Sequence, residues 1–181
     1  VNHMIDSVLV EHDFSASYLR SKGNNFGKEV AESQLTTDTQ VIRISSAMNL
    51  MNVEDYGNEF GNRFAAVQND LDILAKTRED IKNNELGVNE TVAYYQQLTG
   101  NMLRLLELMP ILSEQKTLSN ITNAYINFLN LKSQALNEKL ILKNVFSFGL
   151  FLGKNFANFT KSVNYQSVYE KGYLALATVE Q

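Results

Sequence analysis

The sequence predicts an all-α protein built as an up-and-down bundle of long helices. Apolar residues recur every three or four positions in several segments, which places them on one face of a helix. The chain contains a single proline, Pro110, and proline interrupts helices. No segment keeps the strict alternation of a half-buried strand for long, so no sheet is expected.

Three apolar stripes support individual helices. They are Phe64, Val67, Leu71, Leu74, Arg78 and Ile81; Met102, Leu105, Leu106 and Met109; and Ile121, Ala124, Tyr125, Phe128, Leu131 and Ala135. Gly87 is expected to end one helix in the left-handed conformation, and Asn89 to cap the next. We expect one domain over residues 1–181, with helices near 2–21, 27–52, 56–85, 89–109, 113–147 and 155–179.

The composition argues against several classes of partner and site. Sixteen basic and 20 acidic residues give a net charge of −4, whereas a nucleic-acid binder normally shows a basic surface, so no nucleic-acid partner is expected. The absence of cysteine excludes disulfides and thiolate metal sites. Anion binding stays open, because it needs only a local positive site.

The sequence contains no motif that indicates a particular catalytic reaction. His3 and His12 are the two histidines, and neither belongs to a metal-binding spacing. The run from Gly149 to Lys154 is one residue short of a phosphate-binding loop and is followed by Asn155, so a turn between helices explains it better. We expect no enzyme activity, no cofactor and no metal site.

Other charged residues are interpreted as solvated. Arg43, Arg63, Arg78 and Arg104 are expected to be charges on helix surfaces. Asp70 and Asp72 lie two positions apart, so they do not share a helix face, and both are expected to be exposed.

No segment reaches the roughly 18 apolar residues that a membrane-spanning helix needs. The chain begins abruptly, in sequence that already has a helical pattern, and it ends abruptly too. We therefore interpret it as a fragment of a longer protein.

Several short motifs follow one another in a recognisable order. The run from Glu11 to Gly23 (EHDFSASYLRSKG), then Phe26, then the run from Gln34 to Asp38 (QLTTD), resembles the opening of nitrate- and nitrite-sensing (NIT) domains. The resemblance continues over essentially the whole chain, at Tyr94, Tyr95, Leu98, Tyr125, Phe128, Lys132, Glu138, Phe146, Gly149, Phe159, Gln166 and Tyr169.

The resemblance implies a sensor module. Such domains lie ahead of chemoreceptor signalling regions, histidine kinases or cyclic-dinucleotide enzymes, and a soluble RNA-binding regulator carries one too. It thus implies the extracytoplasmic, periplasmic sensor domain of a bacterial inner-membrane receptor, taken here as a methyl-accepting chemotaxis protein anchored by flanking transmembrane helices. The implied ligand is nitrate or nitrite, bound between helices by arginines, and its binding would rearrange helices and signal across the membrane.

Three positions depart from the family pattern. His12, Leu35 and Lys139 stand where the family has arginine. A guanidinium presents a planar fork of donors that matches planar nitrate, whereas lysine offers a point charge and histidine is mostly neutral at pH 7. We name His12, Lys139, Ser15 and Glu138 as ligand-binding candidates, with weak nitrate binding that strengthens at acidic pH as His12 gains a proton.

Two alternatives remain open. In the first alternative these residues bind no ligand: His12 is a polar residue at the edge of the core, and Lys139 is a solvated charge. In the second alternative the whole chain is not a sensor but a helical protein-interaction or structural module with no small-molecule ligand. Because receptors of this type usually signal as dimers, the resemblance also implies a homodimer that associates through the long N-terminal helices.

Overall fold

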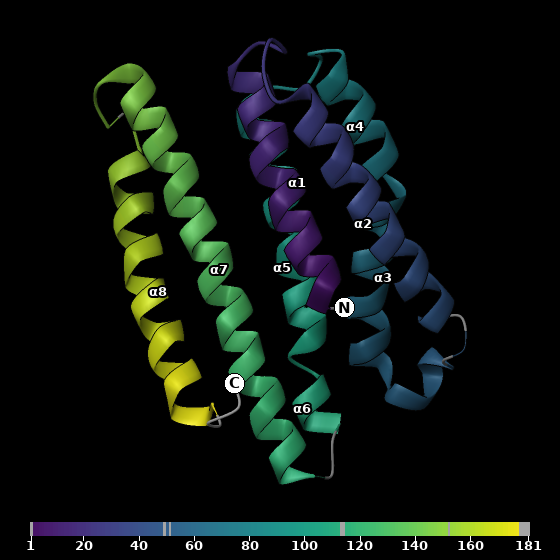
Figure 1. Cartoon of the computed structure of the whole chain (residues 1–181). Helices are drawn as coiled ribbons and strands as arrows, with labels where there is room; N and C mark the ends of the chain where they lie inside the picture. The colour runs from purple at the N-terminus through teal and green to yellow at the C-terminus, as the bar shows by residue number, and fades with distance from the viewer. Residues whose placement is uncertain (1, 49, 51, 113–114, 152, 178–181) are drawn as a thin grey trace. The chain divides into compact units, whose positions relative to one another are not determined.

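The computed structural model describes residues 2–48, 50, 52–112, 115–151 and 153–177. Within these ranges the chain forms helices joined by short turns, and no strand occurs (Figure 1). The prediction of an all-α helical bundle is therefore confirmed. Contacts divide the chain into two compact units, Val1–Leu106 and Glu107–Gln181. That the two units form a single domain stays a prediction.

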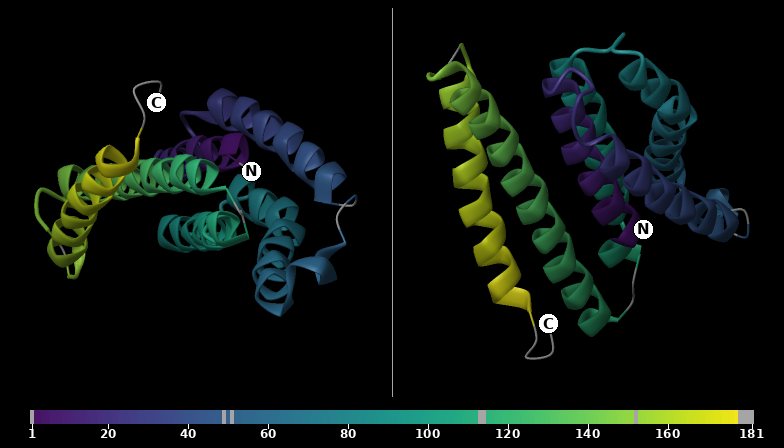
Figure 2. Two further views of the ribbon diagram at one scale, coloured as in Figure 1. Left: turned by 90° about the horizontal axis from the view of Figure 1, so that it is seen from below. Right: turned by 45° about the horizontal axis from the view of Figure 1, so that its top comes forward.

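The first unit is a bundle of helices. They are α1 (Asn2–Arg20), α2 (Gly27–Met48), the short 3-10 helix η1 (Val53–Tyr56), α3 (Asn58–Asp72), α4 (Leu74–Lys82) and α5 (Val88–Leu106). Helix α1 packs against α2 and α5, and α3 packs against α5 and η1 (Figures 1 and 2). The N-terminal helix α1 is therefore in contact with both the next helix in the chain, α2, and the last helix of this unit, α5.

The core of the first unit follows the helical spacing of its apolar residues. Met4, Ile5 and Val8 are buried on α1. On α5, Tyr95 and Leu98 are fully buried. Removing an aliphatic side chain of this size from water stabilises the fold by roughly 1.5 to 3 kcal/mol. The face of α1 that these residues define continues along the helix to polar residues, which form the candidate site.

The turn between α1 and α2 depends on a glycine. Gly23 has a φ of 78°, in the left-handed region that favours glycine. Its amide donates to the Tyr18 carbonyl at 3.0 Å, which closes the end of α1. A Cβ at this position would lie 3.1 Å from the Tyr18 hydroxyl, so both the backbone and the packing require glycine here.

The helix expected over residues 56–85 is instead two helices. The chain breaks between α3 and α4 at Ile73, where φ is −92° and ψ is −4°. The two parts are held by different neighbours: Asp70 on α3 is bound by α5, and Arg78 on α4 is bound by α1 and α2. The break lets each part meet its own partners, and no proline or glycine marks it in the sequence.

The turn before α5 also differs from the prediction. Helix α4 ends at Lys82, and the left-handed residue that follows is Asn84, with a φ of 56°, and not Gly87. Asparagine tolerates this conformation better than most residues. Helix α5 begins at Val88, so the expected cap Asn89 lies inside it. The amide of Gly87 donates to the Glu90 carboxylate at 2.7 Å, which is one half of a capping box.

The second unit is a helical hairpin with a short leading helix. It contains α6 (Met109–Leu112), α7 (Lys116–Phe148) and α8 (Asn155–Leu176), with α7 packed against both of the others (Figure 1). Gly149 ends α7 with a φ of 73°, which confirms the predicted turn. Ala124 and Leu129 on α7 are fully buried. The expected helix ends at 113 and 179 lie outside the described residues.

Candidate functional site

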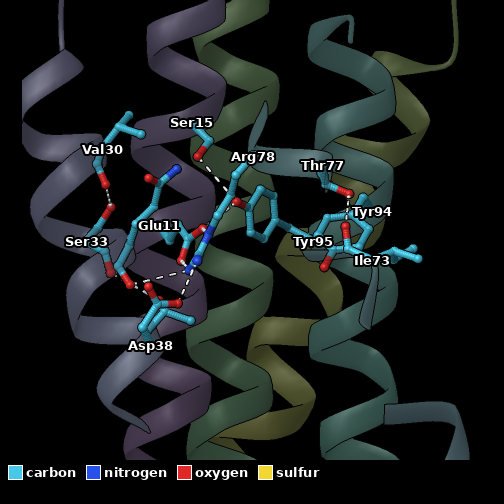
Figure 3. Close-up of polar contacts among 12 residues, drawn as sticks. Glu11, Ser15, Val30, Ser33, Asp38, Ile73, Thr77, Arg78, Tyr94 and Tyr95 are labelled. Atoms are coloured by element: carbon cyan, nitrogen blue, oxygen red, sulfur yellow. Dashed lines mark hydrogen bonds and ion pairs between the residues drawn. The ribbon is translucent and has the colours of Figure 1, made fainter. Parts of the chain in front are cut away.

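Arg78 is the centre of a polar cluster in the first unit. From α4 it donates to both carboxylate oxygens of Glu11 on α1, with Nε to Oε1 at 2.7 Å and Nη2 to Oε2 at 2.9 Å. Its Nη1 donates to Asp38 on α2 at 2.6 Å. Figure 3 shows the Arg78 side chain between the two carboxylates. One guanidinium therefore ties three helices together.

The three charges of this cluster differ in exposure. The Glu11 side chain is fully buried, that of Arg78 is 14% exposed, and that of Asp38 is 50% exposed. Burial alone lowers the pKa of Arg78, but hydrogen bonding and charge from Glu11, reinforced by Asp38, outweigh it and raise the pKa above its usual value. Arg78 therefore stays charged, and both carboxylates hold its guanidinium in place.

Tyr95 extends the cluster to α5. Its hydroxyl donates to Glu11 Oε1 at 2.7 Å, and the Ser15 hydroxyl lies 3.4 Å from it (Figure 3). Burial, reinforced by the negative charge of Glu11, raises the pKa of Tyr95 well above its usual range. The buried Glu11 carboxylate thus receives hydrogen bonds from two helices, which offset the cost of removing it from water.

His12 follows Glu11 in the chain and is nearly fully buried. Its ring stacks on Tyr95, with the ring centroids 5.3 Å apart and the planes inclined by 16°. Burial lowers the pKa of His12 to about 4, against the raising influence of Asp13. At neutral pH His12 is therefore uncharged, and the expected strengthening of anion binding through His12 moves from mildly acidic pH to about pH 4.

One ring nitrogen of His12 has no hydrogen-bond partner among the residues that the structure describes. Nε2 is buried and makes no hydrogen bond to any of the described residues. Such an atom in a folded protein requires an explanation, because an unsatisfied buried polar group costs about 1 to 3 kcal/mol. A hydrogen-bonding ligand or a water molecule at this nitrogen would remove that cost.

The other two predicted residues lie on α7, in the second unit. Glu138 accepts a hydrogen bond from Gln166 of α8 at 2.6 Å. Glu138 and Lys139 both line an open depression of about 420 Å³, whose other walls include Ala135 and Phe146. The structure thus brings His12 and Ser15 together in the first unit, and Glu138 and Lys139 together in the second.

Two residues were wrongly predicted to be solvated surface charges. Arg78 is in the buried cluster, and Asp70 on α3 is 3% exposed, with its carboxylate accepting from Gln97 and Asn101 of α5 at 2.6 Å each. The sequence held a signal for Arg78, because it occupies a position in an apolar stripe. A charge in such a stripe faces the core and must find a partner there.

The comparisons with known proteins assign the chain to one family and one fold. The family model described as nitrate and nitrite sensing, NIT, matches residues 3–181. A solved structure of the NasR transcription antiterminator superposes with a TM-score of 0.92 at 18% sequence identity. That match covers 99% of this chain and 48% of the other, so the chain spans about half the length of that protein. No curated protein sequence matches the chain.

These findings correct the receptor interpretation. The expectation of an extracytoplasmic domain of a transmembrane receptor, and with it the periplasmic location, was wrong, because the solved structure that shares this fold is that of a transcription antiterminator. Among the described residues, no helix is long and apolar enough to cross a membrane. The likeness also conflicts with the expectation of no nucleic-acid partner, since that protein by its name acts in transcription.

Proposed function

The chain belongs to the nitrate and nitrite sensing family, and we propose that it is the small-anion sensing module of a longer regulatory protein. The observation that carries the proposal is the family match over residues 3–181. The buried, unpartnered Nε2 of His12 supports it, because a ligand atom at that point would meet an unmet hydrogen-bonding need. The proposal assigns the chain no catalytic role.

The proposed ligand is nitrate or nitrite. Different residues are proposed to supply its hydrogen bonds and its positive charge. His12 and Ser15 contribute hydrogen bonds without charge, because His12 is neutral at physiological pH. Lys139 is proposed as the source of positive charge only from its correspondence with an arginine of the family pattern. Within the second unit, Glu138 joins α7 to α8 by accepting a hydrogen bond from Gln166. A single ammonium lacks the planar fork of a guanidinium, so the proposed affinity is lower than an arginine site would give.

The proposed signal is a shift of α1. Glu11, the neighbour of His12, ties α1 to α4 through Arg78 and to α5 through Tyr95. A ligand that binds His12 therefore acts on α1, a helix whose packing depends on the few hydrogen bonds of Glu11. Such packing has discrete alternatives, and a ligand that binds one of them better shifts the population toward it.

A second candidate function is a helical interaction module with no small ligand. The absence of arginine at 12, 35 and 139 favours it, as does the neutral state of His12. The likeness to a transcription antiterminator is compatible with it, because an interaction module also fits a regulatory protein. The two candidates differ in whether nitrate stabilises the folded chain.

Thermal unfolding separates the two functions. A ligand that binds only the folded state raises the melting temperature in proportion to the logarithm of its concentration once the site is saturated. Nitrate and nitrite should raise it above the value in chloride at the same ionic strength, with sulfate as a second control. Equal melting temperatures in all four salts would refute the sensing function and leave the interaction module.

We also propose that the module forms a homodimer through α1 and α2. Val10 on α1 is 49% exposed, and Leu35 and Ile42 on α2 are 69% and 66% exposed. Leu35 and Ile42 lie two turns apart on the same helix face, which suits helix pairing. Sedimentation of Ile42→Glu should show weaker self-association than wild type, whereas Val168→Glu on α8 should not change it. Equal association of the two variants would contradict this interface.

A further inference from the structure

A groove in the first unit lies beside Arg78 and has a volume of about 520 Å³. Three helices form it, with Tyr18 from α1, a row of residues from the first half of α2, and the last turns of α4. Its size falls within the range of sites that hold small organic molecules. None of the four ligand candidates from the sequence lines it.

The inner wall of the groove is apolar. Val30 from α2 and Ile81 from α4 are both buried, at 9% and 1% exposure, and both are among the residues that line the groove. The Tyr18 ring and Ala31 complete this surface. An apolar group of a ligand would be removed from water here, which is the main source of affinity in such sites.

The groove also carries polar groups that the fold does not use. Among the described residues, no hydrogen bond or ion pair engages the Tyr18 hydroxyl, the Gln34 side-chain amide or the Lys82 ammonium. Arg78, which also lines the groove, is by contrast engaged by Glu11 and Asp38. Lys82 is therefore the available positive charge of the groove.

The first residue of α2 adds a second attraction for negative charge. Gly27 lines the groove and begins a helix of 22 residues. The amides of a first helical turn have no partner within the helix, and the helix dipole places partial positive charge there. The first residue of α2 and Lys82 thus line the same groove.

Glu79 sets a limit on the charge of a ligand. Its carboxylate lines the groove one helical turn from Lys82 and has no ion-pair partner among the described residues. A ligand with one negative charge can turn that charge toward Lys82 and away from Glu79. A ligand with two negative charges would place one of them near Glu79, where like charges repel.

We propose that this groove is a second ligand site, which takes a small monocarboxylate with an apolar body. The carboxylate binds Lys82 and the start of α2, and the apolar body packs on Val30 and Ile81. This site is independent of the nitrate proposal, because the two share no ligand-binding residue. Since Arg78 also lines the groove, occupancy of the groove should stabilise the contact between α1, α2 and α4.

Isothermal titration with benzoate tests the site. Benzoate should bind, benzamide should bind at least about tenfold more weakly because it has the same shape without the charge, and phthalate should bind weakly because of its second carboxylate. Glu79→Gln should bring phthalate closer to benzoate. Equal binding of benzoate and benzamide, or no saturable benzoate binding at millimolar concentration, would overturn the proposal.

Variants locate the binding in the groove. Lys82→Ala should weaken benzoate about tenfold, whereas Lys76→Ala, an exposed lysine of the same helix that does not line the groove, should leave it unchanged. Ala31→Phe should abolish binding by filling the groove from an exposed helix position, and circular dichroism shows whether it folds. Benzoate binding that survives both Lys82→Ala and a folded Ala31→Phe lies elsewhere, and the assignment would be wrong.

Discussion

The guanidinium of Arg78 donates hydrogen bonds to both carboxylate oxygens of Glu11, at 2.7 and 2.9 Å, although the two residues are 67 positions apart in the chain. Glu11 is fully buried, and Arg78 and Tyr95 supply the hydrogen bonds that a buried carboxylate requires. The pair fixes α4 against α1 at the point where α1 carries His12.

The first prediction concerns this pair. Arg78→Met leaves a buried carboxylate without its cation, which should lower the free energy of unfolding by about 3 to 5 kcal/mol. Lys76→Met, on the same helix, removes an exposed pair with Asp80 and should cost less than about 1 kcal/mol. Glu11→Met/Arg78→Met should recover part of the loss. Urea denaturation measures all three, and an Arg78→Met variant as stable as Lys76→Met would contradict the importance of the pair.

The second prediction is a dependence of stability on pH. The pKa of His12 is lowered to about 4 in the folded state, against 6.5 as the ordinary value, so the unfolded chain binds more protons between these values. The stability from keeping His12 neutral is therefore present above pH 6.5 and is lost as the pH falls toward 4. This residue alone should make the free energy of unfolding about 2 kcal/mol smaller at pH 5 than at pH 7.

Two variants isolate the contribution of His12 from that of the carboxylates. His12→Gln should remove about 2 kcal/mol from the pH dependence between pH 7 and pH 5. His3→Gln replaces the exposed histidine at the start of α1 and should leave the dependence as in wild type. If both variants keep the wild-type slope, His12 is not the buried neutral group described above.

The third prediction compares two aspartates of α3. Asp70 is buried and accepts from Gln97 and Asn101, whereas Asp72 is exposed. Asp70→Ala should destabilise the fold by about 1 to 3 kcal/mol, and Asp72→Ala by less than about 0.5 kcal/mol. Thermal unfolding of the two variants side by side checks this, and equal melting temperatures would mean that the α3–α5 contact does not depend on Asp70.

The fourth prediction compares two glycines within helices. A Cβ on Gly172 would lie 2.9 Å from the Asn127 side chain, so α8 and α7 meet closely there, whereas a Cβ on Gly100 would meet only the end of Arg104 at 3.9 Å. Gly100→Ala should stabilise the protein by up to about 1 kcal/mol, because alanine favours helix. Gly172→Ala should lose that gain and become neutral or destabilising. A Gly172→Ala variant as stable as Gly100→Ala would show that the hairpin has room at this point.

The sequence predicted the helices better than their contacts. Regular apolar spacing predicts a helix because it depends on neighbours three and four residues away, and α7 was predicted in this way. The turn that follows α7 was predicted from the run that begins at Gly149. The division at Ile73 was missed, because it depends on Asp70 and Arg78 finding partners on other helices. Local spacing can indicate that Arg78 faces the core, but it does not show which helices supply the partners of Arg78 and Asp70.

The candidate site was predicted only in part. His12 and Ser15 were named through the family resemblance, and both are buried beside Tyr95. The neutral state of His12 could not be predicted, because it depends on burial by residues far away in the chain. The receptor context was wrong, because a sensing fold does not determine which protein carries it.

The most direct test of the sensing function is isothermal titration of the purified chain with nitrate, followed by the same titration of two lysine variants. We predict saturable binding that weakens about tenfold in Lys139→Ala and is unchanged in Lys171→Ala, an exposed lysine on α8. We also predict that the affinity is the same at pH 7 and pH 6, because His12 stays neutral over this range. The absence of any heat of nitrate or nitrite binding by folded protein at millimolar concentration would contradict the account.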